Sequence, residues 1–191
     1  MDEQLLLGIL VIVTGYLSGS IPFAYLITRR LGIDVFEIGT GNPGAANIFR
    51  MVGRKWGAIV FLTDFSKGAL PVVLATIIQV EMAWVIASGS AAVLGHWFPI
   101  FLRFKGGAGL ATGAGAILIM SPVLGLIAII AGVPLIKILR DTGVGAGVAG
   151  AGYILANAFV GTTGIAIGSC VIGGLVLLRW FVVTFLLNSG R

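Results

Sequence analysis

Long apolar stretches separated by short polar segments dominate the pattern along this chain. Residues 4–28 form 25 consecutive uncharged positions, and further apolar segments follow at about 56–78 and between 81 and 103. A helix needs about 20 mostly apolar residues to cross the hydrocarbon core of a bilayer. Each of these segments is long enough, so the first half of the chain predicts three membrane spans.

The second half contains two apolar runs that are each too long for one span. Residues 106–136 form 31 uncharged positions, and residues 142–178 form 37. One helix over the first run would be about 46 Å long, whereas the hydrocarbon core is about 30 Å thick. Ser121-Pro122 and the segment 161–164 (Gly-Thr-Thr-Gly) supply turn residues inside the runs. Each run therefore predicts two spans, which brings the total to seven.

The basic residues fall on one side of this predicted bundle. With the N-terminus outside, eleven of the twelve Lys and Arg residues lie on the cytoplasmic side, and only Lys67 lies within a span. Cytoplasmic loops of membrane proteins are enriched in Lys and Arg in the same way. We therefore expect an all-α membrane protein with seven transmembrane helices, an outside N-terminus and a cytoplasmic C-terminus. Residues 1–191 are expected to form a single polytopic membrane domain.

The composition excludes several classes of protein. Apolar residues make up 58% of the chain and charged residues only 10%, against about 25% charged in a typical soluble domain. One cysteine and one histidine cannot form an internal disulfide or a Cys/His zinc site, and we expect neither metal nor cofactor. The net charge of +5 is interpreted as membrane topology and anion binding, and not as nucleic-acid binding.

Glycine-rich segments lie where predicted helices begin on the cytoplasmic side. Helix N-termini present unpaired N–H groups and the positive end of the helix dipole. Residues 105–109 and 142–145 are glycine-rich entries of this kind. Together with Arg50, Lys67 and Lys105, they predict a site for one or two phosphate groups. The alternative is that the glycines only permit tight turns and the cations contact lipid headgroups.

Other polar residues have both a functional and a structural interpretation. Thr40, Asn42 and Asn47 can hydrogen-bond substrate oxygens, or they can close a structural turn. Asp64 and Lys67 lie three residues apart on a helix, within reach of an ion pair. Charges within a span are usually functional, and a packing pair is the alternative.

The order and spacing of these motifs resemble the bacterial acyl-phosphate:glycerol-3-phosphate acyltransferases, the PlsY family. The resemblance rests on residues 19–22, 39–50, 64–68 and 95–109. It implies transfer of an acyl chain from acyl phosphate to the 1-hydroxyl of glycerol 3-phosphate, giving lysophosphatidic acid and phosphate. This is the first step of phospholipid synthesis. The implied location is the bacterial plasma (inner) membrane, with a cytoplasmic active face, and membrane lipids and lipid-synthesis enzymes are the implied partners.

The resemblance also suggests roles for individual residues. The implied catalytic residues are Thr40, Asn42, His96 and Lys105. The implied substrate-binding residues are Gly41, Asn47, Arg50, Lys67, Gly106, Gly107, Gly109 and Arg140. Arg50, Lys105 and the amides of Gly106 and Gly107 are expected to bind phosphate. His96, which as a lone membrane histidine favours a packing role, is expected to orient the loop of the second family motif (residues 95–109, here called the second-motif loop). A proton-transfer role is the alternative. Because no general base is evident, a phosphate oxygen of the substrate is expected to take the proton.

The chain departs from the family pattern where positive charge is expected. Ala108 stands at a position that is usually lysine, and Thr40 replaces a serine. Residues 179–187 are apolar after Arg179, where the family typically places His, Asn and Glu in a basic tail. A second hypothesis therefore stands beside the enzyme: a non-catalytic relative that binds lipid phosphate or regulates an active acyltransferase.

Overall fold

The computed structural model describes residues 2–182, and all regular elements in this range are helical. The elements are α1 (Glu3–Ser20), α2 (Phe23–Arg30), α3 (Ala45–Met51), α4 (Arg54–Ile77), α5 (Met82–Trp97), the 3-10 helix η1 (Ile100–Leu102), α6 (Leu110–Met120), α7 (Pro122–Leu139), α8 (Thr142–Val160) and α9 (Thr163–Phe181). Within the described chain, five segments are long and apolar enough to cross a membrane, and two shorter apolar helices accompany them. The prediction of an all-α, multi-pass membrane protein is confirmed.

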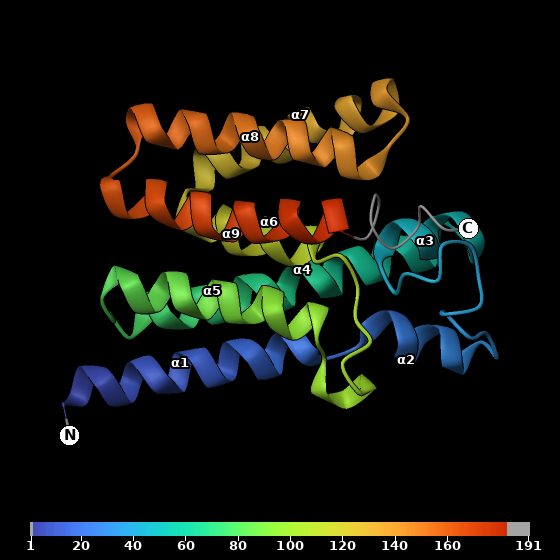
Figure 1. Ribbon diagram of the computed structural model, residues 1–191, viewed down its shortest axis with the longest axis horizontal. Coiled ribbons are helices and arrows are strands. Elements are labelled where there is room, and N and C mark those ends of the chain that lie inside the picture. The colour runs from blue at the N-terminus through green and yellow to red at the C-terminus, as the bar shows by residue number, and fades with distance from the viewer. Residues whose placement is uncertain (1, 183–191) are drawn as a thin grey trace.

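The long helices lie side by side along the longest axis of the molecule (Figure 1). α1, α5, α7 and α9 run toward the end where α2 and α3 lie, and α4, α6 and α8 run in the opposite direction. α7 and α8 pack against each other and form an outer layer over α6 and α9. This alternation suits the seven predicted spans. Their number across a bilayer, and the side that faces the cytoplasm, stay predictions.

Both turns predicted within the long apolar runs are confirmed. α6 ends at Met120 and α7 begins at Pro122, so Ser121 alone joins the two helices. Proline suits the first position of a helix, because its missing N–H would have no helical partner there. α8 ends at Val160. At the start of α9 the Thr162 side chain caps the helix by accepting a hydrogen bond from the Ile165 N–H.

The predicted first span at residues 4–28 lies within an apolar segment long enough to cross a membrane, Glu3–Arg30, but two helices form this segment. α1 ends at Ser20, and α2 begins after Ile21 and Pro22. Proline has no N–H for the helical ladder, and its ring disfavours helical geometry in the preceding residue. The Ile21 N–H donates instead to the Ser18 carbonyl, at 3.2 Å. The Ile21 carbonyl accepts the Phe23 N–H at 3.2 Å, and its second lone pair can accept a bond from another part of the chain.

Buried apolar residues from five helices form the main core. Its fully buried members include Val11 of α1, Val72 of α4, Val93 of α5, Ala116 of α6 and Ile172 of α9. The helices that carry the sequence motifs are therefore fixed to one another by packing. The predictions for residues 183–191, including the apolar tail and its cytoplasmic location, lie outside the described residues.

Candidate functional site

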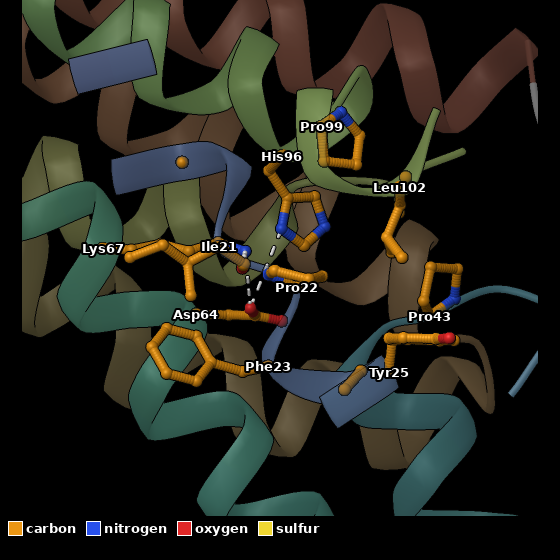
Figure 2. Close-up of a pocket in the computed structure, with 14 residues that line it drawn as sticks. Ile21, Pro22, Phe23, Tyr25, Pro43, Asp64, Lys67, His96, Pro99 and Leu102 are labelled. Carbon is orange, nitrogen blue, oxygen red and sulfur yellow. Dashed lines mark hydrogen bonds and ion pairs between the residues drawn. The ribbon is translucent and has the colours of Figure 1, made fainter. Parts of the chain in front are cut away.

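A pocket lies where the α1–α2 break, α4 and the loop after α5 meet (Figure 2). Asp64 and Lys67 of α4 line it together with His96 of α5. Gly106 and Gly107 contribute from the loop that leads to α6, and the α2–α3 loop contributes through Pro43. Segments far apart in the sequence thus meet at one place, and this place contains residues from all four motif segments.

A buried ion pair forms one wall of the pocket. Lys67 Nζ lies 2.8 Å from Asp64 Oδ1, and the two side chains are 4% and 3% exposed. The same ammonium donates to the Ile21 carbonyl at 3.0 Å. A lysine ammonium has three donors, so two of them are already used within the protein. The predicted substrate-binding residue Lys67 thus lies at the pocket with its charge paired.

His96 lies beside this pair and contacts the second-motif loop. Its Nδ1 is 3.8 Å from Asp64 Oδ1, too far for a hydrogen bond. The His96 carbonyl accepts the Gly107 N–H at 3.1 Å. A Cβ atom on Gly107 would collide with His96 Nε2, so the loop can lie against the imidazole ring only because glycine has no side chain. This geometry suits the predicted loop-orienting role of His96.

The polar side chains of the α2–α3 loop lie in three different environments. Asn42 Oδ1 would lie 3.1 Å from a Cβ atom on Gly107, so Asn42 reaches the pocket loop. Thr40 is exposed, and its hydroxyl accepts the Asn42 N–H at 3.4 Å. Asn47 is buried: its Oδ1 accepts the Thr40 N–H and its Nδ2 donates to the Ile38 carbonyl, each at 3.1 Å. Both ends of the Asn47 amide therefore hydrogen-bond within the loop, so Asn47 stabilises the conformation of the loop.

The predicted glycines mainly permit tight backbone paths. Gly41 and Gly109 have φ angles of +67° and +80°, in the left-handed region that favours glycine. A Cβ atom on Gly106 would collide with the carbonyls of His96 and Trp97. The Gly107 amide, which was expected to bind phosphate, donates to the His96 carbonyl instead. These residues shape the pocket loop, and the Gly107 amide is occupied by the protein itself.

Apart from Lys67, the cations predicted to bind substrate lie outside the pocket lining. Arg50, Lys105 and Arg140 are exposed. The segments that carry Arg50 and Lys105, which are α3 and the α5–α6 loop, lie at the same end of the molecule as α2 (Figure 1). Arg140 follows α7 at the turn into α8. There the Asp141 carboxylate accepts the Val144 N–H at 2.8 Å, so a carboxylate already occupies the α8 N-terminus that was expected to attract phosphate.

A second cavity of about 200 Å³ adjoins the pocket. The two share Ile21, Phe23 and Lys67 in their linings. The remaining lining consists of Leu62 and Leu70 of α4, which are 60% and 62% exposed, and of the hydroxyl residues Ser18, Thr63 and Ser66. Most of the surface that lines the cavity is nevertheless apolar. This cavity therefore opens on the apolar flank of the bundle, where a membrane would meet it.

Asp64 is the charged residue in the described pocket lining that the predicted site did not include. The available signal was a carboxylate three residues before a lysine within an apolar span. That signal did not show that the loop between α5 and α6 would pack over Asp64 and form the pocket with it. Within the described residues, no cluster of three or more His, Cys, Asp or Glu residues could hold a metal ion.

Comparisons with known proteins agree with the motif resemblance. A family model described as "Glycerol-3-phosphate acyltransferase" matches residues 9–187. A protein of that name from Myxococcus xanthus is 46% identical over 142 residues, covering 73% of this chain and 74% of the relative. Glycerol-3-phosphate acyltransferase 1 of Dehalococcoides mccartyi is 54% identical over 114 residues, covering 59% of this chain and 55% of the relative. The chain thus spans about half to three quarters of the length of these relatives.

Solved structures extend the similarity to the whole fold. Two crystal structures of PlsY, described as an integral membrane glycerol 3-phosphate acyltransferase, superpose with TM-scores of 0.87 and 0.86 at 31% identity. They represent its glycerol 3-phosphate and lysophosphatidic acid forms, and each match covers 96% of this chain and 93% of the other. The shared family model, sequence and fold show that this chain belongs to the PlsY family of integral membrane glycerol-3-phosphate acyltransferases.

Proposed function

We propose that this protein transfers an acyl chain from an acyl phosphate to the 1-hydroxyl of glycerol 3-phosphate, giving lysophosphatidic acid and phosphate. The observation that carries the proposal is the junction of a polar pocket with an apolar cavity through Ile21, Phe23 and Lys67. An acyl phosphate has a charged head and an apolar tail, so it needs two such environments side by side. The PlsY structures with glycerol 3-phosphate and lysophosphatidic acid support the same substrate and product here.

The reaction requires positioning more than a protein nucleophile. The 1-hydroxyl oxygen attacks the acyl carbonyl carbon, the bond from that carbon to the phosphate oxygen breaks, and phosphate leaves. The hydroxyl proton passes to a phosphate oxygen of the substrate. Because acyl phosphate is already activated, the protein supplies proximity and charge neutralisation.

Exposed residues around the pocket and residues of the pocket loop have different roles in this proposal. Arg50 and Lys105 are exposed and supply positive charge to the phosphate groups. Thr40 and Asn42 position the attacking hydroxyl or the acyl carbonyl. His96 holds the pocket loop through its contacts with Gly107.

The pocket end of the bundle faces the cytoplasm in this proposal. Most basic residues belong to segments at that side, as the positive-inside pattern requires. The protein would then cross the bacterial plasma (inner) membrane seven times with its N-terminus outside. Both water-soluble glycerol 3-phosphate and the acyl donor of lipid synthesis would reach the pocket from the cytoplasmic side.

Phosphate release by the purified protein in lipid tests this function. With palmitoyl phosphate and glycerol 3-phosphate, we expect release well above the uncatalysed rate. Lys105→Ala and Asn42→Ala should each reduce it at least about tenfold, the scale of a lost charged hydrogen bond. Lys137→Ala is the matched control, because Lys137 is likewise an exposed lysine but lies on α7, outside the motif segments of residues 19–109.

The possible outcomes separate the activity from the site. Absence of release would refute the enzyme, and retained binding of glycerol 3-phosphate would then favour the non-catalytic relative. Release that neither variant changes would leave the activity in place and refute the assignment of Lys105 and Asn42.

A further inference from the structure

At the α1–α2 break the Ile21 carbonyl lies outside the regular helical ladder, and one of its hydrogen bonds comes from the Phe23 N–H at 3.2 Å. The last carbonyl groups of a helix have no helical partner, and water is scarce inside a span. The Ile21 carbonyl at this break accepts the Lys67 ammonium at 3.0 Å. A cation also interacts favourably with the negative end of the helix dipole. Lys67 thus ties α4 to the end of α1.

A second bond fixes the same contact in the opposite direction. The Ser18 hydroxyl donates to the Lys67 backbone carbonyl at 3.0 Å. α1 and α4 are therefore joined on both sides of the Lys67 residue, by its side chain and by its backbone. This double contact holds the break at one position along α4.

Asp64 holds the Lys67 ammonium in this place. Its Oδ1 lies 2.8 Å from Lys67 Nζ, and both side chains are almost fully buried. A buried lysine without a counter-charge is strongly unfavourable, so Asp64 is what allows the ammonium to reach the Ile21 carbonyl.

The same carboxylate oxygen also faces His96. Asp64 Oδ1 lies 3.8 Å from His96 Nδ1, and Figure 2 shows the imidazole ring directed toward it. Among the described residues, His96 Nδ1 is a buried polar atom with no hydrogen-bond partner. On its other side the ring meets Gly107 of the pocket loop. A shift of the Asp64 carboxylate would therefore displace Lys67 at the α1–α2 break and His96 at the second-motif loop.

We infer that Asp64 is a positioning residue of the acyl-transfer site, acting through Lys67 on the α1–α2 break and through His96 on the loop at Gly107. This inference rests on the proposed function for its kinetic consequence. It gives Lys67 a role in holding the pocket wall, because two of its donors already have protein partners.

A charge-free double variant distinguishes positioning from simple stabilisation. Asp64→Asn alone leaves a buried unpaired lysine, so it is expected to fold poorly. Asp64→Asn with Lys67→Met removes both charges at similar volume, and replacing a buried ion pair in this way is often neutral for stability. The Ile21 carbonyl nevertheless loses the bond from α4 and keeps only the local one from the Phe23 N–H. We therefore expect the double variant to regain the melting temperature of the parent but to keep a kcat at least tenfold lower.

Amide hydrogen exchange gives a readout that does not depend on turnover. Loss of the Lys67 bond to Ile21 should make α2, residues 23–30, exchange at least about fivefold faster in the double variant, because local opening governs exchange. Tyr153→Phe is the control: it removes a 2.9 Å bond to the Ile117 carbonyl in a part of the bundle outside the pocket lining. It should alter neither kcat nor α2 exchange.

Two results would overturn the inference: a double variant with the parent kcat, or unchanged exchange in α2. If the double variant cannot be recovered folded, Lys67→Arg replaces it, since it keeps the charge but alters the reach to Ile21. A lowered kcat at an unchanged melting temperature supports positioning, and an unchanged kcat refutes it. If the parent protein shows no turnover, the proposed function fails, and α2 exchange alone decides the inference.

Discussion

The substitution Gly107→Ala isolates the contact between the pocket loop and His96. The φ angle of Gly107 lies outside the left-handed region, so alanine suits the backbone. Its Cβ atom would nevertheless collide with His96 Nε2 and lie 3.1 Å from Asn42 Oδ1. To restore an ordinary contact, the imidazole ring must retreat by about 1 Å, and a displacement of this size can reduce catalysis by about 100-fold. That loss corresponds to about 2.7 kcal/mol of transition-state stabilisation.

The assay compares kcat/KM for phosphate release with the thermal stability of each variant. Gly44→Ala is the matched control in the α2–α3 loop, because the nearest atom to its added Cβ lies 3.7 Å away, an ordinary contact. We expect Gly44→Ala to retain kcat/KM within about threefold. If the loss in Gly107→Ala arises through His96, the same substitution should cost much less in a His96→Ala background, as coupled residues are not additive. A Gly107→Ala protein with the parent kcat/KM would refute this reasoning.

Three further predictions concern the cavity, the loop and the helix crossing. Ser66→Trp should fill the cavity of about 200 Å³ and raise the KM for palmitoyl phosphate more than the KM for a short-chain acyl phosphate. The control Ile77→Trp, at a 71% exposed position outside the cavity lining, should change neither KM. Asn47→Asp keeps the loop's acceptor but removes its amide donor, so a loss of about 1–3 kcal/mol in unfolding free energy is expected; a denaturant midpoint equal to that of the parent would contradict it. Gly68→Ala would press its Cβ into the Thr112 carbonyl where α4 meets α6, and overpacking should lower stability by about 1–3 kcal/mol; an unchanged melting temperature would show that the helices can separate at little cost.

The sequence was most informative where structure depends on neighbouring residues. Apolar length fixed which segments could be helices, and the turns at Ser121 and at 161–162 followed from proline, glycine and threonine in otherwise apolar runs. The break at Pro22 had the same kind of local signal. The apolar length of residues 4–28 predicted a span without showing that two helices would form it.

Hydrogen-bond partners in the site were less accessible from the sequence. Asn42 and Asn47 lie in the same glycine-rich loop and have the same side chain, yet one reaches Gly107 and the other is buried within the loop. The sequence also indicated amides at Gly106 and Gly107 for phosphate binding. It could not show that the Gly107 N–H already has the His96 carbonyl as its partner.

By itself, the sequence determined that this protein is a bundle of membrane helices with glycine-rich motifs and most of its positive charge on one side. It could do so because membrane insertion depends on the length, polarity and charge of contiguous segments. Only the tertiary structure decided that Asp64 lies between Lys67 and His96, and that Lys67 donates a hydrogen bond to the Ile21 carbonyl at the break between α1 and α2. The two contacts between different helical segments join residues 32 and 46 positions apart, and their geometry depends on how closely the helices pack. No local pattern encodes that packing.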